Sequence, residues 1–580
     1  MKRITCLFLI VLTALACSEK APNSQVKDVS LNGTWQFLAS NDKTEEILLK
    51  ANFSEWDTIQ VPGNWDTRAR YSEYVGKGYY QKSFELPKGW TNKQIRLKFD
   101  AVYETTKVWF NGEYLGEHVG GYTPFEFNIT DKVKTNGSNS VVVMADNTYK
   151  RGAWWAWGGI SRDVTLIANE NVRIVYQHIS SVPDFENQKV DFTIKYKLEN
   201  NGSSTASVNL YTEIEGVHRD SVAINIEKES TAVSYLKFEK PLKDVELWHF
   251  NTPKLYKLNS SISVDNNIVD SASDKFGIRK FEAKGEQFYL NNEAVRMNGI
   301  NRVHDHPAYG NTEPDELVLK DMLDIKYNLK CNFSRLMHAP LSKNLLKFCD
   351  SIGFLLVEEI PVWGEDPQCI PGNPLTKQWL KEMIERDYNH PSVVAWSVGN
   401  ELRTIGPKWG KQHLTKDQND YVNSMIDYVE TLDKTRLKTY VSNTAYQGGE
   451  IGKEPYEKVD FLCVNSYGHA IKIVERVHER FPGKPIFVSE IGKGQIGPAP
   501  SAELDGDFVG WLKELKAYPY VTGISLWSYN DYRSNYKGTP ESGFREWGIV
   551  SETRQKKEAY NQLKEVYEYW NLKPLKNSKK

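Results

Sequence analysis

The run VVAWSVGNE (393–401) has the composition of a buried strand and ends in an ionisable residue. Amphipathic stretches at 376–388 and 417–432 flank it and have the spacing of helices. Further helical stretches lie at 315–329, 341–352 and 503–516. The other strand candidates are VRMNGIN (295–301), NFSRL (332–336), FLLVEEI (354–360), KTYVSN (438–443), FLCVNS (461–466), PIFVSEI (485–491) and GISLWSY (523–529). Eight such units in about 300 residues predict a (β/α)8 barrel over 276–580.

Two segments ahead of the barrel have an all-β pattern. Residues 31–170 carry short alternating runs broken by turn signals, and the pair Asn111-Gly112 predicts a hairpin. This pattern indicates a β-sandwich of jelly-roll type. Residues 171–275 give strands at intervals of roughly ten residues, which favours an immunoglobulin-like sandwich without the antibody Cys–Trp–Cys signature.

The N-terminus is typical of a targeting segment. Two basic residues precede an apolar stretch at 4–16, which is too short to span a bilayer and ends in a small-x-small pattern. Cys17 follows at once, and this arrangement resembles the lipobox of bacterial lipoproteins, in which the cysteine is acylated. We therefore expect a signal peptide at 1–17, a polar tether at 18–30, and export to the periplasm or the outer-membrane surface. Plain secretion remains open.

Composition limits the partners. The net charge is −2 with no basic stripe, which gives no reason to expect nucleic acid. No other run of about 18 apolar residues occurs, so any membrane contact would be through the lipid anchor. The 17 Trp and 31 Tyr suit either sugar binding or a β-rich core. Four cysteines beyond the signal lack metal-like spacing; buried free thiols are expected, and one disulfide remains open: Cys331, Cys349, Cys369 and Cys463.

Two glutamates end strand candidates of the predicted barrel. Glu401 follows Gly399-Asn400, and Glu490 follows Ser489. Because barrel active sites lie at the carboxyl ends of the strands, both side chains should enter one mouth. Glycoside hydrolysis needs such a pair: a protonated acid with a raised pKa and an ionised nucleophile, ~5–5.5 Å apart for retention.

Several segments resemble glycoside hydrolase family 2, in the same order along nearly the whole mature chain. They are NHPS (389–392) with the strand after it, KPIFVSE (484–490), FGIR (276–279), FYLNNEAVRMNGINRVHDHP (288–307), VPGNW (61–65), GKGYYQKSFELP (76–87) and GGISRDVTL (158–166). The resemblance implies a jelly roll, a sandwich and a barrel, with Glu401 as general acid/base and Glu490 as nucleophile.

The resemblance also implies substrate-binding roles. They fall on Asn400, which would bind the sugar 2-hydroxyl, on Arg335, which would lie beside the nucleophile, and on His338, which matches the family's histidine after that arginine. Asp305 would lie at the sugar-binding end of the pocket, Tyr467 near the nucleophile, and Trp527 would form the floor of the sugar site. Arg335 could instead tie adjacent strands, and Trp527 could fill the core.

The chain departs from the family in two places. EIPVWG (359–364) lacks the ligands of metal-using β-galactosidases, so no metal or cofactor is expected, and His304 with His306 is interpreted as structural. REWGI (545–549) lacks the Asn-x-Lys of β-glucuronidases. Arg545 could bind a uronate or a sulfated sugar by charge-assisted hydrogen bonds, or it could belong to a solvated loop.

These observations predict an exo-acting, retaining β-glycosidase acting on oligo- or polysaccharides. β-Galactosidase-like action is placed first. The alternatives are β-glucuronidase or β-galacturonidase activity, then β-mannosidase activity, and a non-catalytic glycan-binding protein on the same scaffold. No oligomeric state is indicated.

Overall fold

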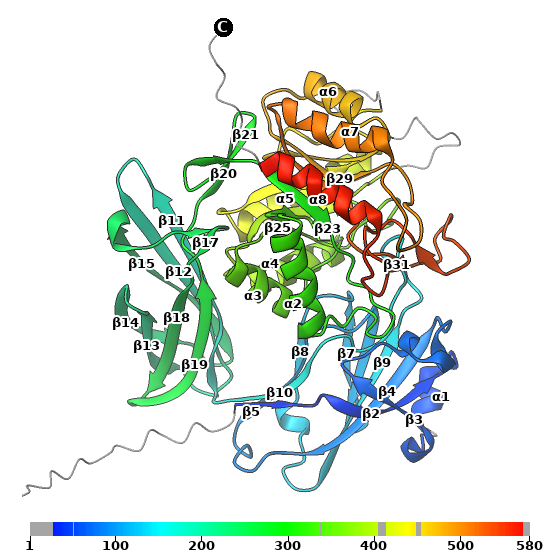
Figure 1. Ribbon diagram of the computed structural model, residues 1–580. Helices are drawn as coiled ribbons and strands as arrows, with labels where there is room; N and C mark the ends of the chain where they lie inside the picture. The colour runs from blue at the N-terminus through cyan, green and yellow to red at the C-terminus, as the bar shows by residue number, and fades with distance from the viewer. Residues whose placement is uncertain (1–26, 50, 337, 404–412, 448–453, 572–580) are drawn as a thin grey trace, which may run out of the picture.

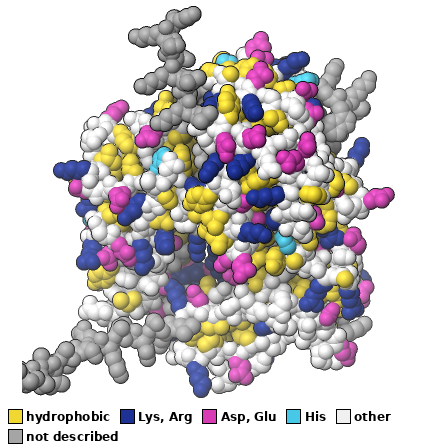
Figure 2. All heavy atoms as spheres, in the orientation of Figure 1, with side chains coloured by type: hydrophobic (Ala, Val, Ile, Leu, Met, Phe, Trp, Pro, Cys, Tyr) yellow, Lys and Arg dark blue, Asp and Glu magenta, His cyan; other side chains and the backbone are white. Residues whose placement is uncertain are grey.

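The computed structural model describes residues 27–49, 51–336, 338–403, 413–447 and 454–571. The predicted signal peptide, Cys17 and most of the predicted tether lie outside the described residues. Figure 1 shows two β-sandwiches, in blue and in cyan to green, against a barrel that runs from green to red. Among the described residues, no helix is both long and apolar enough to cross a bilayer. The face in Figure 2 intersperses cationic and anionic side chains.

The first domain is a sandwich of two antiparallel sheets. One sheet has the order β1 (Asp28–Ser30), β10 (Val164–Asn169), β5 (Gln94–Phe99) and β8 (Phe125–Asn128). The other has the order β3 (Asp57–Val61), β2 (Gly33–Ala39), β4 (Lys77–Glu85), β9 (Ser138–Asp146), β6 (Thr105–Phe110) and β7 (Glu113–Val119). Trp35, Phe37 and Trp65 are buried between the sheets. A short helix, α1 (Thr44–Leu49), follows β2.

Two features of this domain test the sequence patterns. The predicted hairpin joins β6 and β7, and Asn111 and Gly112 both have positive φ, 51° and 88°, as a tight hairpin turn requires. The prediction of a tether is wrong for Asp28–Ser30, because these residues pair with β10 as strand β1. A three-residue polar strand carries too little alternation to be recognised from sequence.

The second domain is also a two-sheet sandwich. One sheet has the order β11 (Val172–Asp184), β12 (Lys189–Asn200) and β15 (Ser230–Pro241), and the other β14 (His218–Ile226), β13 (Ala206–Ile214), β18 (Tyr256–Val264) and β19 (Asn267–Phe276). A small pair, β16 (Trp248–His249) and β17 (Thr252–Pro253), follows β15. The domain is tied to the barrel at Asn389, whose amide accepts from Ile179 N–H at 2.9 Å and donates to Gln177 O at 2.8 Å.

The third domain is an eight-stranded parallel barrel, so the predicted fold class is confirmed. Around the barrel the strands are β23 (Met297–Asn301), β30 (Val521–Trp527), β29 (Ile486–Gly492), β28 (Leu462–Tyr467), β27 (Leu437–Ser442), β26 (Val393–Asn400), β25 (Leu355–Glu359) and β24 (Phe333–Ser334). A meander of β20 (Phe281–Lys284), β21 (Gln287–Leu290) and β22 (Glu293–Val295) precedes it, and Phe281 and Phe288 pack on the interior of the barrel.

The barrel closes between its first and second strands without a regular ladder. Asn332 N–H donates to Asn298 O at 3.1 Å, and Ser334 Oγ donates to Ile300 O at 2.6 Å. A Cβ on Gly299 would lie 1.9 Å from the carbonyl oxygen of Phe333, so this close approach requires glycine.

Helices cover the outside of the barrel (Figure 1). They are α2 (Asp315–Leu323), α3 (Lys343–Ile352), α4 (Pro374–Asp387), α5 (Lys416–Leu432), α6 (Ala470–Arg480), α7 (Gly506–Glu514) and α8 (Glu558–Asn571). The start of α5 is fixed by a capping box between Thr415 and Gln418. The sequence pattern did not predict α6 and α8. The pair β31 (Tyr532–Arg533) and β32 (Phe544–Arg545) lies in the loop after β30. The four cysteines of the barrel are buried and free.

Candidate active site

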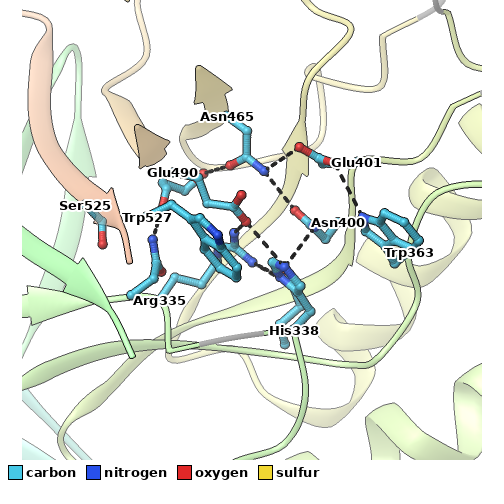
Figure 3. Close-up of polar contacts among 12 residues, drawn as sticks. Arg335, His338, Trp363, Asn400, Glu401, Asn465, Glu490, Ser525 and Trp527 are labelled. Carbon is cyan, nitrogen blue, oxygen red and sulfur yellow. Dashed lines mark hydrogen bonds and ion pairs between the residues drawn. The ribbon is translucent and has the colours of Figure 1, made fainter. Parts of the chain in front are cut away.

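Glu490, the predicted nucleophile, lies on β29 and is held by three side chains from the ends of two other strands. Its Oε1 forms an ion pair with Nη2 of Arg335, which follows β24. Tyr467, at the end of β28, donates its hydroxyl to Oε2. Nε2 of His338 lies 3.4 Å from Oε1. A cation, a hydroxyl donor and an imidazole ring thus surround the carboxylate of Glu490. Figure 3 shows Arg335 and His338 beside it.

Arg335 is itself held in place by a second carboxylate. It is fully buried, and its Nη1 donates to Glu359 at 2.8 Å. Burial raises the pKa of Glu359, but the charge of Arg335 together with the contacts of His338 and Ser397 outweighs burial, so the net shift of that pKa is downward. Glu359 also accepts from Ser397. The guanidinium therefore lies between two carboxylates, those of Glu359 and Glu490.

Glu401, the predicted acid/base, follows directly after β26. Its φ is +50°, a left-handed value that costs a non-glycine residue roughly 1–2 kcal/mol. Arg403 Nη1 donates to Oε2 at 2.7 Å, and Trp363 Nε1 lies 3.4 Å from the same oxygen. Asn465 Nδ2 donates to Oε1 at 3.0 Å. The strained backbone thus orients the carboxylate of Glu401, and Arg403, Trp363 and Asn465 hold it in place.

A polar bridge joins the two glutamates. His338 lies beside Glu490, and its Nε2 is 3.3 Å from Nδ2 of Asn400. Asn465 donates both to Asn400 Oδ1 at 3.2 Å and to Glu401. Figure 3 shows these side chains lying close together at the ends of the barrel strands. The structure therefore brings both carboxylates, Asn400, Arg335 and His338 together.

The electrostatics of Glu401 differ from the expectation. A general acid should have a raised pKa. Burial raises the pKa of Glu401, but the charge of Arg403 and the hydrogen bonds from Asn465 and Arg403 outweigh burial, so the net shift is downward. The structure thus holds Glu401 in its ionised form, the form that serves as a base.

Trp527 ends β30 and lies beside His338 (Figure 3). Its ring is parallel to that of His338, with centroids 5.5 Å apart and an interplanar angle of 3°. Its Nε1 lies 3.2 Å from the hydroxyl of Tyr532. Tyr532 pairs with Arg545 in the short ladder after β30, so Arg545 lies at the rim on this side.

The jelly roll closes another side of the site. Trp154 packs against His338 with ring centroids 5.3 Å apart. Trp157 Nε1 donates to Asp305 Oδ2 at 2.6 Å, and Arg533 N–H donates to Oδ1 at 3.3 Å. Asp305, predicted at the sugar-binding end, therefore has both oxygens engaged by protein groups. A cavity of about 570 Å³ lies next to Asp305 and is lined by Trp155, Trp157 and Arg533.

Asp305 is expected to make stability depend on pH. Burial raises its pKa from 3.8 to about 7. A raised folded-state pKa means that stability is full below pH ~4 and falls as the pH rises to about 7, by at most roughly 4 kcal/mol. In Asp305→Asn this loss disappears, so the melting temperature of the variant should gain on the unmodified protein between pH 4.5 and 7.5. Asp191→Asn, at an exposed position of β12, should run parallel to the unmodified protein. If the melting temperature of Asp305→Asn ran parallel to that of the unmodified protein over this pH range, the raised pKa of Asp305 would be contradicted.

Several residues of the site were not predicted from the sequence. Asn465 ends a predicted strand, and Arg403 lies two positions after Glu401, so both had a positional signal. Trp154 and Trp157 come from another domain, where only the aromatic run WWAW gave a hint. His306 stacks on Tyr309. Over the described residues, no three His, Cys, Asp or Glu side chains form a metal-binding group.

An eight-stranded barrel with two carboxylates at one mouth, carried on two β-sandwiches, defines the class: it is the arrangement that glycoside hydrolases use. The profile described as glycosyl hydrolases family 2, TIM barrel domain, matches residues 281–572. The sugar binding domain of the same family matches 29–170, and the profile described as glycosyl hydrolases family 2 matches 172–279. The chain belongs to glycosyl hydrolase family 2, which confirms the predicted resemblance.

Relatives with different names resemble the chain. The β-galactosidase of Thermoanaerobacter pseudethanolicus is 32% identical over 432 residues, covering 70% of this chain and 54% of that protein. The β-glucuronidase of Bacteroides fragilis is 25% identical over 603 residues, covering 93% and 81%. The crystal structure of Bacteroides uniformis β-glucuronidase superposes with a TM-score of 0.81 at 25% identity, covering 93% and 69%. The chain spans about half the length of several curated relatives that it matches, 54% in the first case.

Proposed function

We propose that this protein is an exo-acting, retaining β-glycosidase with Glu490 as nucleophile and Glu401 as acid/base. The observation that carries the proposal is the pair of carboxylates joined by a polar bridge, each of them paired with an arginine. Glu490 has Arg335 and Tyr467 as partners, whereas Glu401 lies on the other side of the Asn400–Asn465 bridge.

The geometry supports a double displacement. Glu490 attacks the anomeric carbon, the bond from that carbon to the leaving oxygen breaks, and the proton of Glu401 goes to that oxygen. Water then attacks the glycosyl-enzyme, Glu401 takes the proton of this water, and the carboxylate of Glu490 is released. In this proposal the Asn400 amide binds the sugar 2-hydroxyl, a contact that strengthens in the transition state.

The jelly-roll wall supports exo action. Trp154 packs on His338, and Trp157 is bonded to Asp305, so the barrel mouth is closed on the side of the first domain. A pocket closed on one side admits the end of a glycan chain, whereas an open groove would admit its middle.

The preferred terminal sugar could be a neutral galactoside or a uronide. The T. pseudethanolicus relative, named a β-galactosidase, favours a neutral galactoside. A specific observation favours a uronide instead: in the described part of the chain, Nε of Arg545 and Nε1 of Trp547 are buried without a hydrogen-bond partner. Trp547 packs edge-on against Tyr467, which contacts Glu490. Two unpartnered donors, one of them cationic, near the nucleophile suit a sugar carboxylate.

Aryl β-glycosides decide between the two sugars. If the substrate is a uronide, Arg545→Gln should lower kcat/KM on the β-glucuronide or β-galacturonide by roughly 10- to 100-fold, because one charge-assisted contact is lost. Turnover of the galactoside should stay nearly constant. Arg476→Gln, at an exposed position of α6, removes the same charge elsewhere and should change neither. A galactoside preferred by the unmodified protein would exclude the uronide, and a uronide rate unaffected by Arg545→Gln would exclude Arg545 as the partner of the sugar carboxylate.

A further inference from the structure

A separate cavity of about 250 Å³ lies beside Glu401. Trp363 and Arg403 line it, and both contact Oε2 of Glu401. Tyr149 and Lys150, from the jelly roll, form the facing wall. Since a general acid gives its proton to the leaving oxygen, the space next to Glu401 is where the leaving group would lie.

The charged groups of this cavity are unequally paired. Arg151 is neutralised by two buried carboxylates, Glu104 and Asp366, with Nη1 donating to Asp366 at 2.9 Å. Lys150 donates to the neutral amide of Asn535 at 2.7 Å. Arg403 has Glu401 as its carboxylate partner. The remaining acid of the wall, Glu365, is exposed. Among the described lining residues, Lys150 therefore has a neutral partner, and Arg403 is the cation that both lines the cavity and contacts Glu401.

The pairing of Arg403 with Glu401 conflicts with the acid role. The charged or titratable groups that act on Glu401 are Arg403, His338, Tyr467 and Tyr446. Arg403 is the nearest cation, and a cation that close favours the carboxylate form over the protonated one. Proton donation therefore becomes easier when part of the Arg403 charge is taken up by another anion.

We propose that this cavity binds the sugar unit on the leaving side of the cleaved bond, that this unit carries a carboxylate or a sulfate, and that Arg403 binds that anion. The proposal rests on the proposed glycosidase function. With an anionic leaving sugar bound, Arg403 divides its charge between substrate and Glu401, and the acid can be protonated. When the leaving sugar departs, Arg403 returns to Glu401 alone, and the carboxylate is ready to act as base towards water.

Three disaccharides test this assignment. They share the terminal sugar that the aryl panel identifies and differ in the leaving sugar, which is neutral, carboxylated or sulfated. The unmodified protein should show a kcat/KM at least about 10-fold higher on one of the anionic substrates, the effect of one charge-assisted hydrogen bond. In Arg403→Gln this ratio should fall to about 1, and in Arg403→Lys it should be partly retained.

The pH profile gives a readout that a structural role would not move. On the neutral disaccharide, the basic limb should shift to higher pH in Arg403→Gln, because Glu401 then keeps its proton longer. Lys347→Gln, which removes an exposed cation of α3 lining a different cavity, should leave both ratio and profile unchanged.

Several outcomes would overturn the proposal. Equal rates of the unmodified protein on all three disaccharides would do so, as would an anion preference that survives in Arg403→Gln. If aryl β-glycosides are cleaved in either case, the glycosidase function stands and only the anionic subsite is wrong. If no β-glycoside is cleaved at all, both proposals fail together.

Discussion

Replacing Glu490 with alanine is expected to lower kcat on an activated aryl β-glycoside by on the order of 10⁴-fold or more, because no covalent intermediate can form. Steady-state turnover of a nitrophenyl glycoside measures this loss. Removing Glu490 also leaves Arg335 without one of its two carboxylate partners. Glu490→Gln, which keeps the volume of the side chain, should therefore accompany it, with thermal unfolding to show that both variants are folded.

Added azide separates the role of Glu490 from simple damage to the site. Azide can occupy the space left in Glu490→Ala and attack the anomeric carbon from the side of the missing carboxylate. The product should then be a glycosyl azide of α configuration. A Glu490→Ala protein that retains near-normal turnover, or that yields only the β-azide, would show that another group is the nucleophile.

Replacing Glu401 with alanine should produce a loss that depends on the leaving group. Leaving oxygens of high pKa, such as those of sugars, need a proton, so cleavage of a disaccharide should fall by roughly 10²–10⁴-fold. A dinitrophenyl glycoside has a leaving group that departs as an anion, and its bond cleavage should fall far less. Pre-steady-state release of dinitrophenol measures that step directly.

The second half-reaction provides the control for Glu401→Ala. Without a general base, the glycosyl-enzyme should accumulate and give a burst of one equivalent of phenol, followed by slow turnover. Azide should accelerate that slow phase and yield the β-azide, the opposite configuration from Glu490→Ala. An equal loss on sugar and dinitrophenyl leaving groups would argue against an acid/base role.

The fold was largely predictable because each barrel strand is a short apolar run between helices. Such runs are buried on both faces, and their composition alone separates them from amphipathic helices. The meander 281–295 was not separated from the first barrel strand, since its alternation continues into VRMNGIN (295–301) without a break. The closure of the barrel could not be seen either. It depends on contacts of Asn332 and Ser334 across a seam that has no regular ladder.

The candidate site was predictable where it follows strand ends. Parallel strands place their carboxyl ends at one rim, so Glu401, Glu490 and Tyr467 could be expected to meet. The parts that were not predicted depend on tertiary contacts. The sequence does not indicate that Trp157 reaches Asp305 from another domain. Nor does it indicate that Arg403 turns back onto Glu401 rather than towards solvent.

The tryptophan wall contributed by the jelly roll also bears on how such proteins can diversify. Because Trp154 and Trp157 belong to a domain with its own core, the outline of the pocket can be altered by changes far from the barrel in sequence. Exchanging the first domain between related chains would reshape the entrance while every catalytic strand stayed intact. Two domains therefore build the wall of the pocket, and the barrel alone does not complete it.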